Sequence, residues 1–232
     1  MRIDKFLSDG AGITRSEARS KIRNGLVKLN GEIIRNISQH VSEVSEVFLE
    51  DKKIIYRKYV YIMMNKPKGV ISATEDKSKK TVIDIIDSSY SRFGLFPVGR
   101  LDIDTEGFLL LTNDGSLSHK LLSPSKKFGK TYYVKLNSEI SDADIEKLRN
   151  GVDIGDIVTK KADVKKLSEN EIELTITEGK FHQIKRMAEK VSNKVIYLKR
   201  LAYGSLFLDS SLIPGEYREL TESELMVLKQ DE

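Results

Sequence analysis

The sequence contains no cysteine and no tryptophan, and none of its apolar runs approaches membrane-spanning length. The missing cysteines exclude disulfide scaffolds, thiolate metal sites, thiol nucleophiles and redox-active cysteines together. A transmembrane helix needs about 18 or more apolar residues in a row, so no membrane span is predicted. The first ten residues, MRIDKFLSDG, carry charges from the second position and lack the apolar core of a signal peptide. We therefore expect a cytoplasmic protein that has no membrane partner.

The net charge of +4 is spread unevenly along the 232 residues. Residues 1–30 contain seven basic and three acidic side chains, and this excess equals that of the whole chain. Such asymmetry indicates a polyanion-binding N-terminal segment attached to a neutral body. A basic helix face that only meets solvent is the alternative. The remaining length and the 39% of apolar residues are enough for a second, larger core.

Residues 1–50 predict two short helices followed by a hairpin. Thr14 and Glu17 have the spacing of a capping box, and Gly25 is placed to end that helix in a left-handed conformation. Basic side chains recur every four residues along this helix, at Arg15, Arg19 and Arg23. Asn30-Gly31 between apolar residues predicts a tight hairpin turn. The charged residues 50–58 predict a linker.

From residue 59 on, strand and helix patterns are mixed. The alternating segments KTYYVKL (130–136) and EIELTIT (171–177) predict half-buried strands, and FLLLTNDG (108–115) predicts a buried strand that ends in an Asp-Gly turn. Two more strands are predicted at 59–65 and 69–74, and helices at 141–151, at 180–191 and after Thr221. This order lacks the regular alternation of a doubly wound sheet, so we expect an α+β fold with a largely antiparallel sheet. The predicted domains are 1–58 and 59–232.

Common cofactor and nucleophile motifs do not fit this sequence. GLFPVGRL (94–101) has the glycine spacing of a phosphate loop, but Arg100-Leu101 replaces the required Lys-Ser/Thr. His40, His119 and His182 are far apart and form no HExxH pair, and no serine lies in a GxSxG elbow. We therefore expect neither a cofactor nor a metal site.

An acidic loop precedes the most apolar predicted strand and contains Asp102 and Asp104. The pair invites comparison with the two carboxylates of a glycoside hydrolase. However, alternate residues of an extended loop point apart, which is poor geometry for an acid–base pair, and no tryptophan is available to stack on a sugar. The alternative is that Asp102, Asp104 and Thr105 only cap a turn.

The segment GRLDIDTEGFLLLTNDG (99–115) resembles the signature of RNA pseudouridine synthases, whose Gly-Arg-Leu-Asp carries the essential aspartate. Three further segments resemble the same family in the same order: NKPKG (65–69), KTYYV (130–134) and EGKFHQIKRM (178–187). Residues 2–31 resemble an S4 RNA-binding domain. The resemblance covers essentially the whole chain and is to the RsuA/RluB branch, which acts on ribosomal RNA.

This resemblance implies a cofactor-free isomerisation of uridine to pseudouridine. It assigns the essential carboxylate to Asp102, as a nucleophile or as the base that removes a sugar proton. It places Lys185 beside Asp102 as the cation that keeps the carboxylate ionised. It also makes Tyr132 the residue that stacks on the base and handles a proton, while Tyr133 faces the other side of the strand.

The resemblance also implies an RNA-binding surface. Arg100 would extrude the target nucleotide or fill the space that it leaves, and Thr105 would shape the substrate loop. Further RNA contacts are expected from Arg15, Arg19, Arg23, Lys28 and Lys66. The segments HQIKRM and PGEYRELTESEL resemble the small-subunit enzymes most, so we expect a monomer whose partner is small-subunit ribosomal RNA. The alternatives are a large-subunit synthase and a non-catalytic, S4-containing ribosome-assembly protein.

Overall fold

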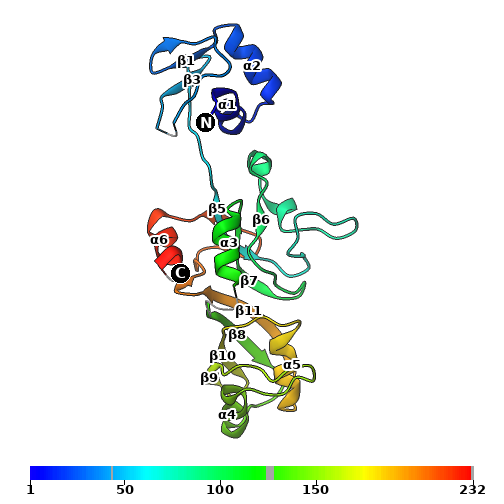
Figure 1. The fold of residues 1–232 in the computed structure, drawn as a ribbon. Coiled ribbons are helices and arrows are strands. Elements are labelled where there is room, and N and C mark those ends of the chain that lie inside the picture. The colour runs from blue at the N-terminus through cyan, green and yellow to red at the C-terminus, as the bar shows by residue number, and fades with distance from the viewer. Residues whose placement is uncertain (43, 124–127, 231–232) are drawn as a thin grey trace. The chain divides into compact units, whose positions relative to one another are not determined.

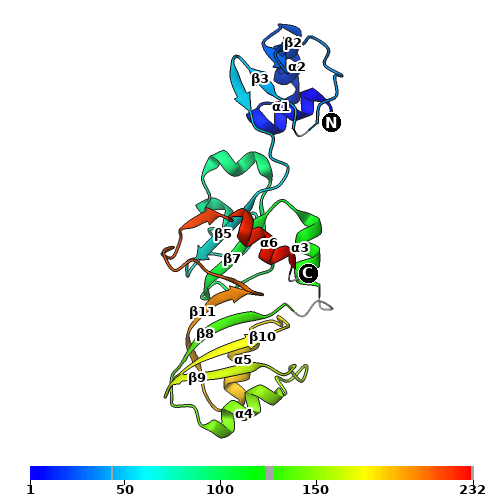
Figure 2. The same ribbon diagram turned by 90° about the vertical axis from the view of Figure 1, so that its left-hand side faces the viewer.

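The computed structural model describes residues 1–42, 44–123 and 128–230. These residues form two compact units, and each is described by itself (Figures 1 and 2). The first unit holds Met1–Tyr59 with Ser89–Gly94, and the second holds the rest of the described chain. No helix in the described ranges has the length and apolarity needed to cross a membrane.

The first unit packs two helices against a four-stranded sheet. Its helices are α1 (Ile3–Ala11) and α2 (Arg15–Arg23), and its strands are β1 (Val27–Leu29), β2 (Glu32–Ile33), β3 (Val47–Leu49) and β4 (Lys52–Ile54), in the order β2-β1-β3-β4. Fully buried apolar side chains from both helices and the sheet form one core. The predicted capping box of Thr14 and Glu17 is confirmed, as is the Asn30-Gly31 turn, where both residues have positive φ.

The prediction of a linker over residues 50–58 is wrong for its first half. Glu50 and Asp51 form a turn with φ of 49° and 63°, and β4 then pairs with β3. Aspartate tolerates this left-handed conformation, so a charged dipeptide makes a hairpin turn here without glycine. Both residues of the turn also bind cations, since Lys21 contacts Glu50 and Lys28 contacts Asp51.

The second unit is built on a nine-stranded sheet in the order β13-β5-β7-β11-β8-β10-β9, with β6 paired to β7 and β12 to β11. The strands are β5 (Tyr61–Lys66), β6 (Phe96–Pro97), β7 (Glu106–Thr112), β8 (Lys130–Leu136), β9 (Asp163–Ser168), β10 (Glu171–Ile176), β11 (Val195–Tyr203), β12 (Leu206–Phe207) and β13 (Tyr217–Glu219). The helices are α3 (Gly115–Leu122), α4 (Asp142–Asn150), α5 (Gln183–Lys190) and α6 (Glu222–Gln230), with short 3₁₀ helices η1 (Ile83–Ile85) and η2 (Ser88–Phe93). Only β7 and β11 pair in parallel among these strands, so the predicted α+β class is confirmed.

Two local predictions for this unit are wrong. The segment 69–74 forms no strand; Ile71 makes only an isolated bridge with Thr81. Asp114 does not end β7 in a simple turn, because its side chain accepts a hydrogen bond from the Leu117 amide and begins α3. Aspartate favours both turns and helix N-caps, and the sequence pattern did not separate the two.

The alternation of β8 decides which of its side chains face α5. Val134 and Leu136 pack with apolar residues of α4 and α5, so the even-numbered residues of β8 face these helices. Tyr133 points the other way and stacks edge-on against Tyr197 of β11. Tyr132 therefore lies on the face that α5 covers.

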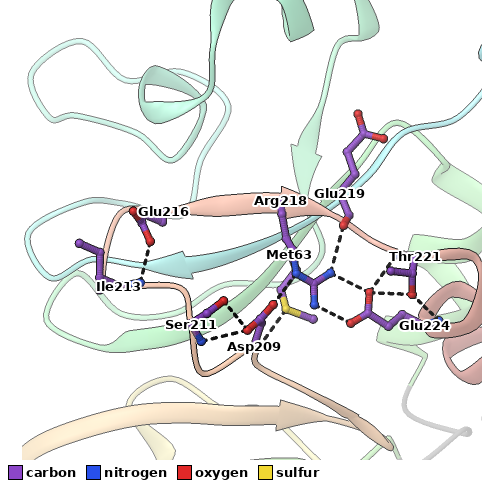
Figure 3. A network of polar contacts seen from close by, with 9 residues as sticks. All are labelled: Met63, Asp209, Ser211, Ile213, Glu216, Arg218, Glu219, Thr221 and Glu224. Atoms are coloured by element: carbon purple, nitrogen blue, oxygen red, sulfur yellow. Dashed lines mark hydrogen bonds and ion pairs between the residues drawn. The ribbon is translucent and has the colours of Figure 1, made fainter.

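A network of polar contacts fixes β13 and α6 to the loop that follows β12 (Figure 3). The Arg218 guanidinium donates from Nε to Asp209 at 2.6 Å and from two nitrogens to Glu224 at 2.7 and 2.8 Å. Glu224 in turn accepts from the backbone amide of Thr221 and forms the predicted cap of α6. These contacts, with Arg218 first, lower the pKa of Glu224 from 4.5 to about 2.

Replacement of Glu224 by glutamine should make the second unit less stable at neutral pH but not in acid. Because the pKa of Glu224 is lowered in the folded state, its contribution is complete above about pH 4.5 and is lost as the pH falls toward 2. We expect the variant to lose about 1–2 kcal/mol at pH 7, since solvent partly screens the pair. Urea unfolding followed by circular dichroism at pH 7 and pH 2.5 measures this difference. An equal loss at both pH values would contradict the charge-based explanation.

Candidate active site

The loop that precedes β7 carries Asp102 and is held by hydrogen bonds on several sides. The Thr105 amide donates to the Asp102 carbonyl at 3.1 Å, which closes a tight turn. The Gly69 amide donates to the Ile103 carbonyl at 2.7 Å. The Ser72 hydroxyl donates to the carbonyl of Leu101 and accepts from its amide, both at 3.1 Å. The aspartate therefore projects from a rigid frame.

Lys66 occupies a different position from the one expected of a substrate-binding residue. Its side chain is completely buried, and Nζ donates to the carbonyls of Pro67 and Thr105, each at 3.0 Å. Burial lowers the pKa of Lys66 to about 8, although nearby carboxylates work in the other direction. In this arrangement Lys66 cannot reach RNA. It supports the Asp102 loop from beneath.

Lys185 of α5 joins the carboxylates of Asp102 and Asp104. Its Nζ lies 2.9 Å from Asp102 Oδ2 and 2.6 Å from Asp104 Oδ1. Burial opposes the charge of Lys185, but the two carboxylates outweigh it and raise the pKa of the lysine. The same contact lowers the pKa of Asp104 against the effect of its partial burial. The expectation that the two aspartates point apart is therefore wrong, because the turn brings both onto one cation.

The start of α5 explains why Lys185, and not its neighbour Arg186, faces Asp102. The apolar stripe of this helix is buried, which leaves Lys185 at its edge beside the loop. Arg186 points to the segment near Asp156 instead, where it donates to that carboxylate and to the Ile154 carbonyl. His182 precedes the helix with a positive φ of 49°, and its Nε2 lies 3.8 Å from Asp102 Oδ1.

A narrow pocket of about 90 Å³ contains the predicted site residues of the second unit other than Lys66. We call it the Asp102 pocket; besides Asp102 it is lined by Arg100, Thr105, Tyr132, His182, Gln183 and Lys185, among others. Tyr132 is 7% exposed, whereas Arg100 is exposed. Thr105 is buried with an unpaired hydroxyl. The structure thus brings Asp102, Tyr132, Lys185, Arg100 and Thr105 together and leaves Lys66 outside.

Comparison with known proteins identifies the family to which this chain belongs. The sequence profile described as RNA pseudouridylate synthase matches residues 60–190, and the S4 domain profile matches residues 1–47. The chain belongs to the RNA pseudouridylate synthase family. An RNA pseudouridine synthase of Bacillus subtilis is 49% identical, with 99% of each chain covered. The ribosomal small subunit pseudouridine synthase A of Escherichia coli K12 is 38% identical, with 97% of this chain and 98% of the relative covered.

A solved structure described as a crystal structure of pseudouridylate synthase has the same fold. It superposes with a TM-score of 0.70 at 38% identity and covers 98% of this chain and 99% of that chain. The first unit of this family member is thus an S4 domain, and the second has the pseudouridine synthase fold.

In the S4 domain, two of the three predicted RNA-binding arginines also stabilise the fold. Asp4 of α1 is completely buried, and Arg19 Nε donates to its carboxylate at 2.9 Å. Arg2 and Arg15 contact the same carboxylate at 3.1 and 3.6 Å. Burial opposes the charge of Asp4, but these arginines hold its pKa below the usual range. Arg15 and Arg19 therefore neutralise a buried acid, whatever else they bind.

Arg23 and Lys28 are placed differently. Arg23 is exposed, and its guanidinium forms no ion pair with the residues that the structure describes. Lys28 lies on β1 and contacts Asp51 at 2.7 Å. Arg23 is consequently the cleaner probe of an RNA contact in this family member.

Substitution of Arg23 by alanine should weaken RNA binding without affecting stability, whereas Arg19→Ala should affect both. One lost phosphate contact lowers the slope of log affinity against log salt by about 0.7 to 0.9. Arg19→Ala leaves the buried Asp4 with weaker compensation and should cost about 1–2 kcal/mol of stability. Filter binding across a salt series and thermal unfolding measure the two effects. Addition of Asp4→Asn to Arg19→Ala should recover part of the stability, and a failure to do so would contradict the proposed pairing.

Sequence reasoning missed several residues that build this site. Ser72 was assigned to a strand that does not form, so its contact with Leu101 could not be foreseen. Gln183 is 4% exposed, donates to Glu178 and accepts from the Lys180 amide, which fixes the start of α5. A signal was available for Gln183, because it is a polar residue on the same helical stripe as Met187. Nothing in the pattern singled out His182.

Proposed function

We propose that this protein converts a uridine of small-subunit ribosomal RNA to pseudouridine. The observation that carries the proposal is the convergence of Asp102, Tyr132 and Lys185 on one pocket. It is supported by identities of 38 to 40% over nearly the full length to enzymes named ribosomal small subunit pseudouridine synthase A. The reaction is an isomerisation, so it requires neither an oxidant nor an energy-rich phosphate.

Asp102 is the group at which the chemistry starts. Either its carboxylate attacks C1′ of the ribose, or it removes a sugar proton; in both routes the C1′–N1 bond breaks. The uracil then turns and forms a bond from C5 to C1′; in the first route the bond between Asp102 and C1′ breaks in this step, and in the second Asp102 returns the proton to the sugar. The C5 proton then leaves and N1 gains one. The Lys185 ammonium lies 2.9 Å from Asp102 Oδ2 and holds the carboxylate in position for the first step.

Tyr132 and Arg100 position the nucleotide. The buried ring of Tyr132 offers a stacking surface for the uracil, and its hydroxyl can take part in the final proton transfer. Arg100 is exposed at the rim of the pocket, where it can help to extrude the nucleotide or fill its place in the RNA. Thr105 closes the turn that presents Asp102.

We further propose that residues 1–58 hold the RNA and residues 59–232 carry out the reaction. Arg15, Arg19, Arg23 and Lys28 supply positive charge to the first part. The enzyme acts as a monomer in the cytoplasm, where ribosomal RNA is processed. Sedimentation of the purified protein with and without RNA tests its oligomeric state.

Mapping of pseudouridine in ribosomal RNA tests the proposed function. RNA from cells that lack this protein should miss one or more pseudouridines of the small subunit, and the purified protein should restore them. Loss of a large-subunit position instead would assign the protein to the other branch of the family. Unchanged pseudouridine in both RNAs would leave a non-catalytic, S4-containing assembly protein as the explanation.

A further inference from the structure

A larger cavity adjoins the Asp102 pocket and has no role in the mechanism above. It measures about 310 Å³ and shares Arg100, Tyr132, Gly179 and Lys180 with the Asp102 pocket. We call it the Lys130 cavity. An occupant of this cavity would lie next to a base stacked on Tyr132.

The Lys130 cavity lies over one face of the strand pair β8 and β11. Arg200 of β11 pairs with Tyr132 of β8, and Tyr203 pairs with Lys130. The ring of Tyr203 lies between two cations, with Lys130 Nζ at 5.3 Å and the Arg200 guanidinium carbon at 5.5 Å from its centroid. Two positive groups are thus held close together inside the protein.

Arg200 is a buried charge with incomplete hydrogen bonding. Its side chain is 2% exposed, and Nε donates to the Phe108 carbonyl at 2.7 Å. Its Nη2 is buried and has no hydrogen-bond partner among the residues that the structure describes. An unpaired buried polar group costs free energy, and a charged one costs more. The guanidinium therefore places beside the cavity a positive charge that no carboxylate of the described residues neutralises.

Lys130 increases the same imbalance. Its Nζ donates to the Phe128 carbonyl at 3.2 Å, and the charge has no carboxylate partner among the described residues. Burial, together with the neighbouring Arg200, lowers the pKa of Lys130 to about 8. Both effects disfavour the charged form of Lys130, and an anion bound nearby would favour it.

The rest of the lining does not restore neutrality. Arg100, Lys160 and Lys180 also line the cavity, and Glu178 is its one carboxylate in the described part of the chain. Glu178 already accepts from the Lys160 amide and from Gln183. The cavity thus has the charge of an anion site.

We propose that the Lys130 cavity binds a backbone phosphate of the RNA next to the target uridine, with Lys130 and Arg200 as its anion-binding groups. This inference rests on the proposed function. A nucleotide that enters the Asp102 pocket carries its own phosphates with it, and the cavity that adjoins this pocket is lined by cations. Charge-assisted hydrogen bonds to phosphate are among the stronger polar contacts in proteins.

The test compares Lys130→Met with Lys130→Arg and with Lys190→Met. Methionine keeps the unbranched shape and removes the buried charge, so the variant should fold; thermal unfolding checks this. Arginine keeps the charge, and Lys190 is an exposed residue of α5 outside the cavity, which makes its variant a matched control. The probes are inorganic phosphate, titrated calorimetrically at constant ionic strength, and a small-subunit ribosomal RNA transcript bound across a salt series.

For Lys130→Met we expect the phosphate heat to disappear and the RNA affinity to fall about tenfold. The salt slope should decrease by about 0.7, the value for one contact to single-stranded RNA. Lys130→Arg should retain most of the affinity, and Lys190→Met should keep the phosphate heat unchanged.

Equal RNA affinity and salt slope for wild type and Lys130→Met would overturn the proposal. Phosphate binding that depends on Lys130 without any effect on RNA would also overturn it, because the cavity would then be a site for free anions. Neither measurement requires turnover. A wild-type protein that binds RNA through Lys130 but forms no pseudouridine would contradict the proposed function, whereas the contact of Lys130 with an RNA phosphate would stand.

Discussion

Replacement of Asp102 by asparagine should abolish pseudouridine formation while the protein still folds and binds RNA. The amide keeps the shape of the side chain but offers neither an ionised nucleophile nor a base. We expect turnover below about 1% of wild type, as for the loss of a central catalytic group in other enzymes. Tritium release from RNA labelled at C5 of uridine measures the rate, and filter binding measures the affinity. Residual turnover of more than a few per cent would remove Asp102 from its proposed role.

Asp104→Asn is the matched control for this substitution. Asp104 binds the same Lys185 nitrogen, but it is about half exposed and an exposed ion pair contributes little. We expect the rate to fall no more than about fivefold. A loss as large as that of Asp102→Asn would mean that the two carboxylates act as a unit.

Replacement of Lys185 by methionine should lower the rate strongly and change its pH dependence. The variant leaves the Asp102 and Asp104 carboxylates together without the cation that contacts both. The ionised form of the pair is then disfavoured, so the acidic limb of the pH–rate profile should move to higher pH. We expect a loss of about 100-fold or more near neutral pH. Single-turnover rates between pH 5 and 9, set against wild type, measure both effects.

Lys185→Arg and Arg186→Met distinguish the effect of the cation beside Asp102 from that of the other positive charge on α5. Arginine retains the cation and should be partly active, although its planar fork does not match a lysine that bridges two carboxylates. Arg186 lies next in sequence but faces Asp156, so its loss should leave the pH profile in place. A normal rate and an unmoved profile for Lys185→Met would make Lys185 a surface charge only.

Several features of the fold could be predicted from short stretches of the sequence. The capping box at Thr14, the Asn30-Gly31 turn and the alternation of β8 were readable because each depends on residues only a few positions apart. The resemblance of residues 99–115 to a family signature directed attention to Asp102. The same resemblance placed Lys185 beside Asp102, although 83 positions of chain separate the two residues. Neither source gave the second contact of Lys185, with Asp104, because only the docking of α5 onto the turn brings both carboxylates to one lysine.

By itself the sequence determined the α+β class, because capping and periodicity act locally. The S4 and synthase segments and the residues of the site followed from the resemblance of its motifs to a known family. Only the tertiary structure decided which basic side chains are buried or paired within the protein and which can bind RNA. It buried Lys66 under the Asp102 loop, tied Arg15 and Arg19 to the buried Asp4, and left Arg200 with an unpaired nitrogen. The residue type, lysine or arginine, does not distinguish these environments. The function of each side chain depends on desolvation and on partners brought from distant parts of the chain, and these are fixed only when the chain folds.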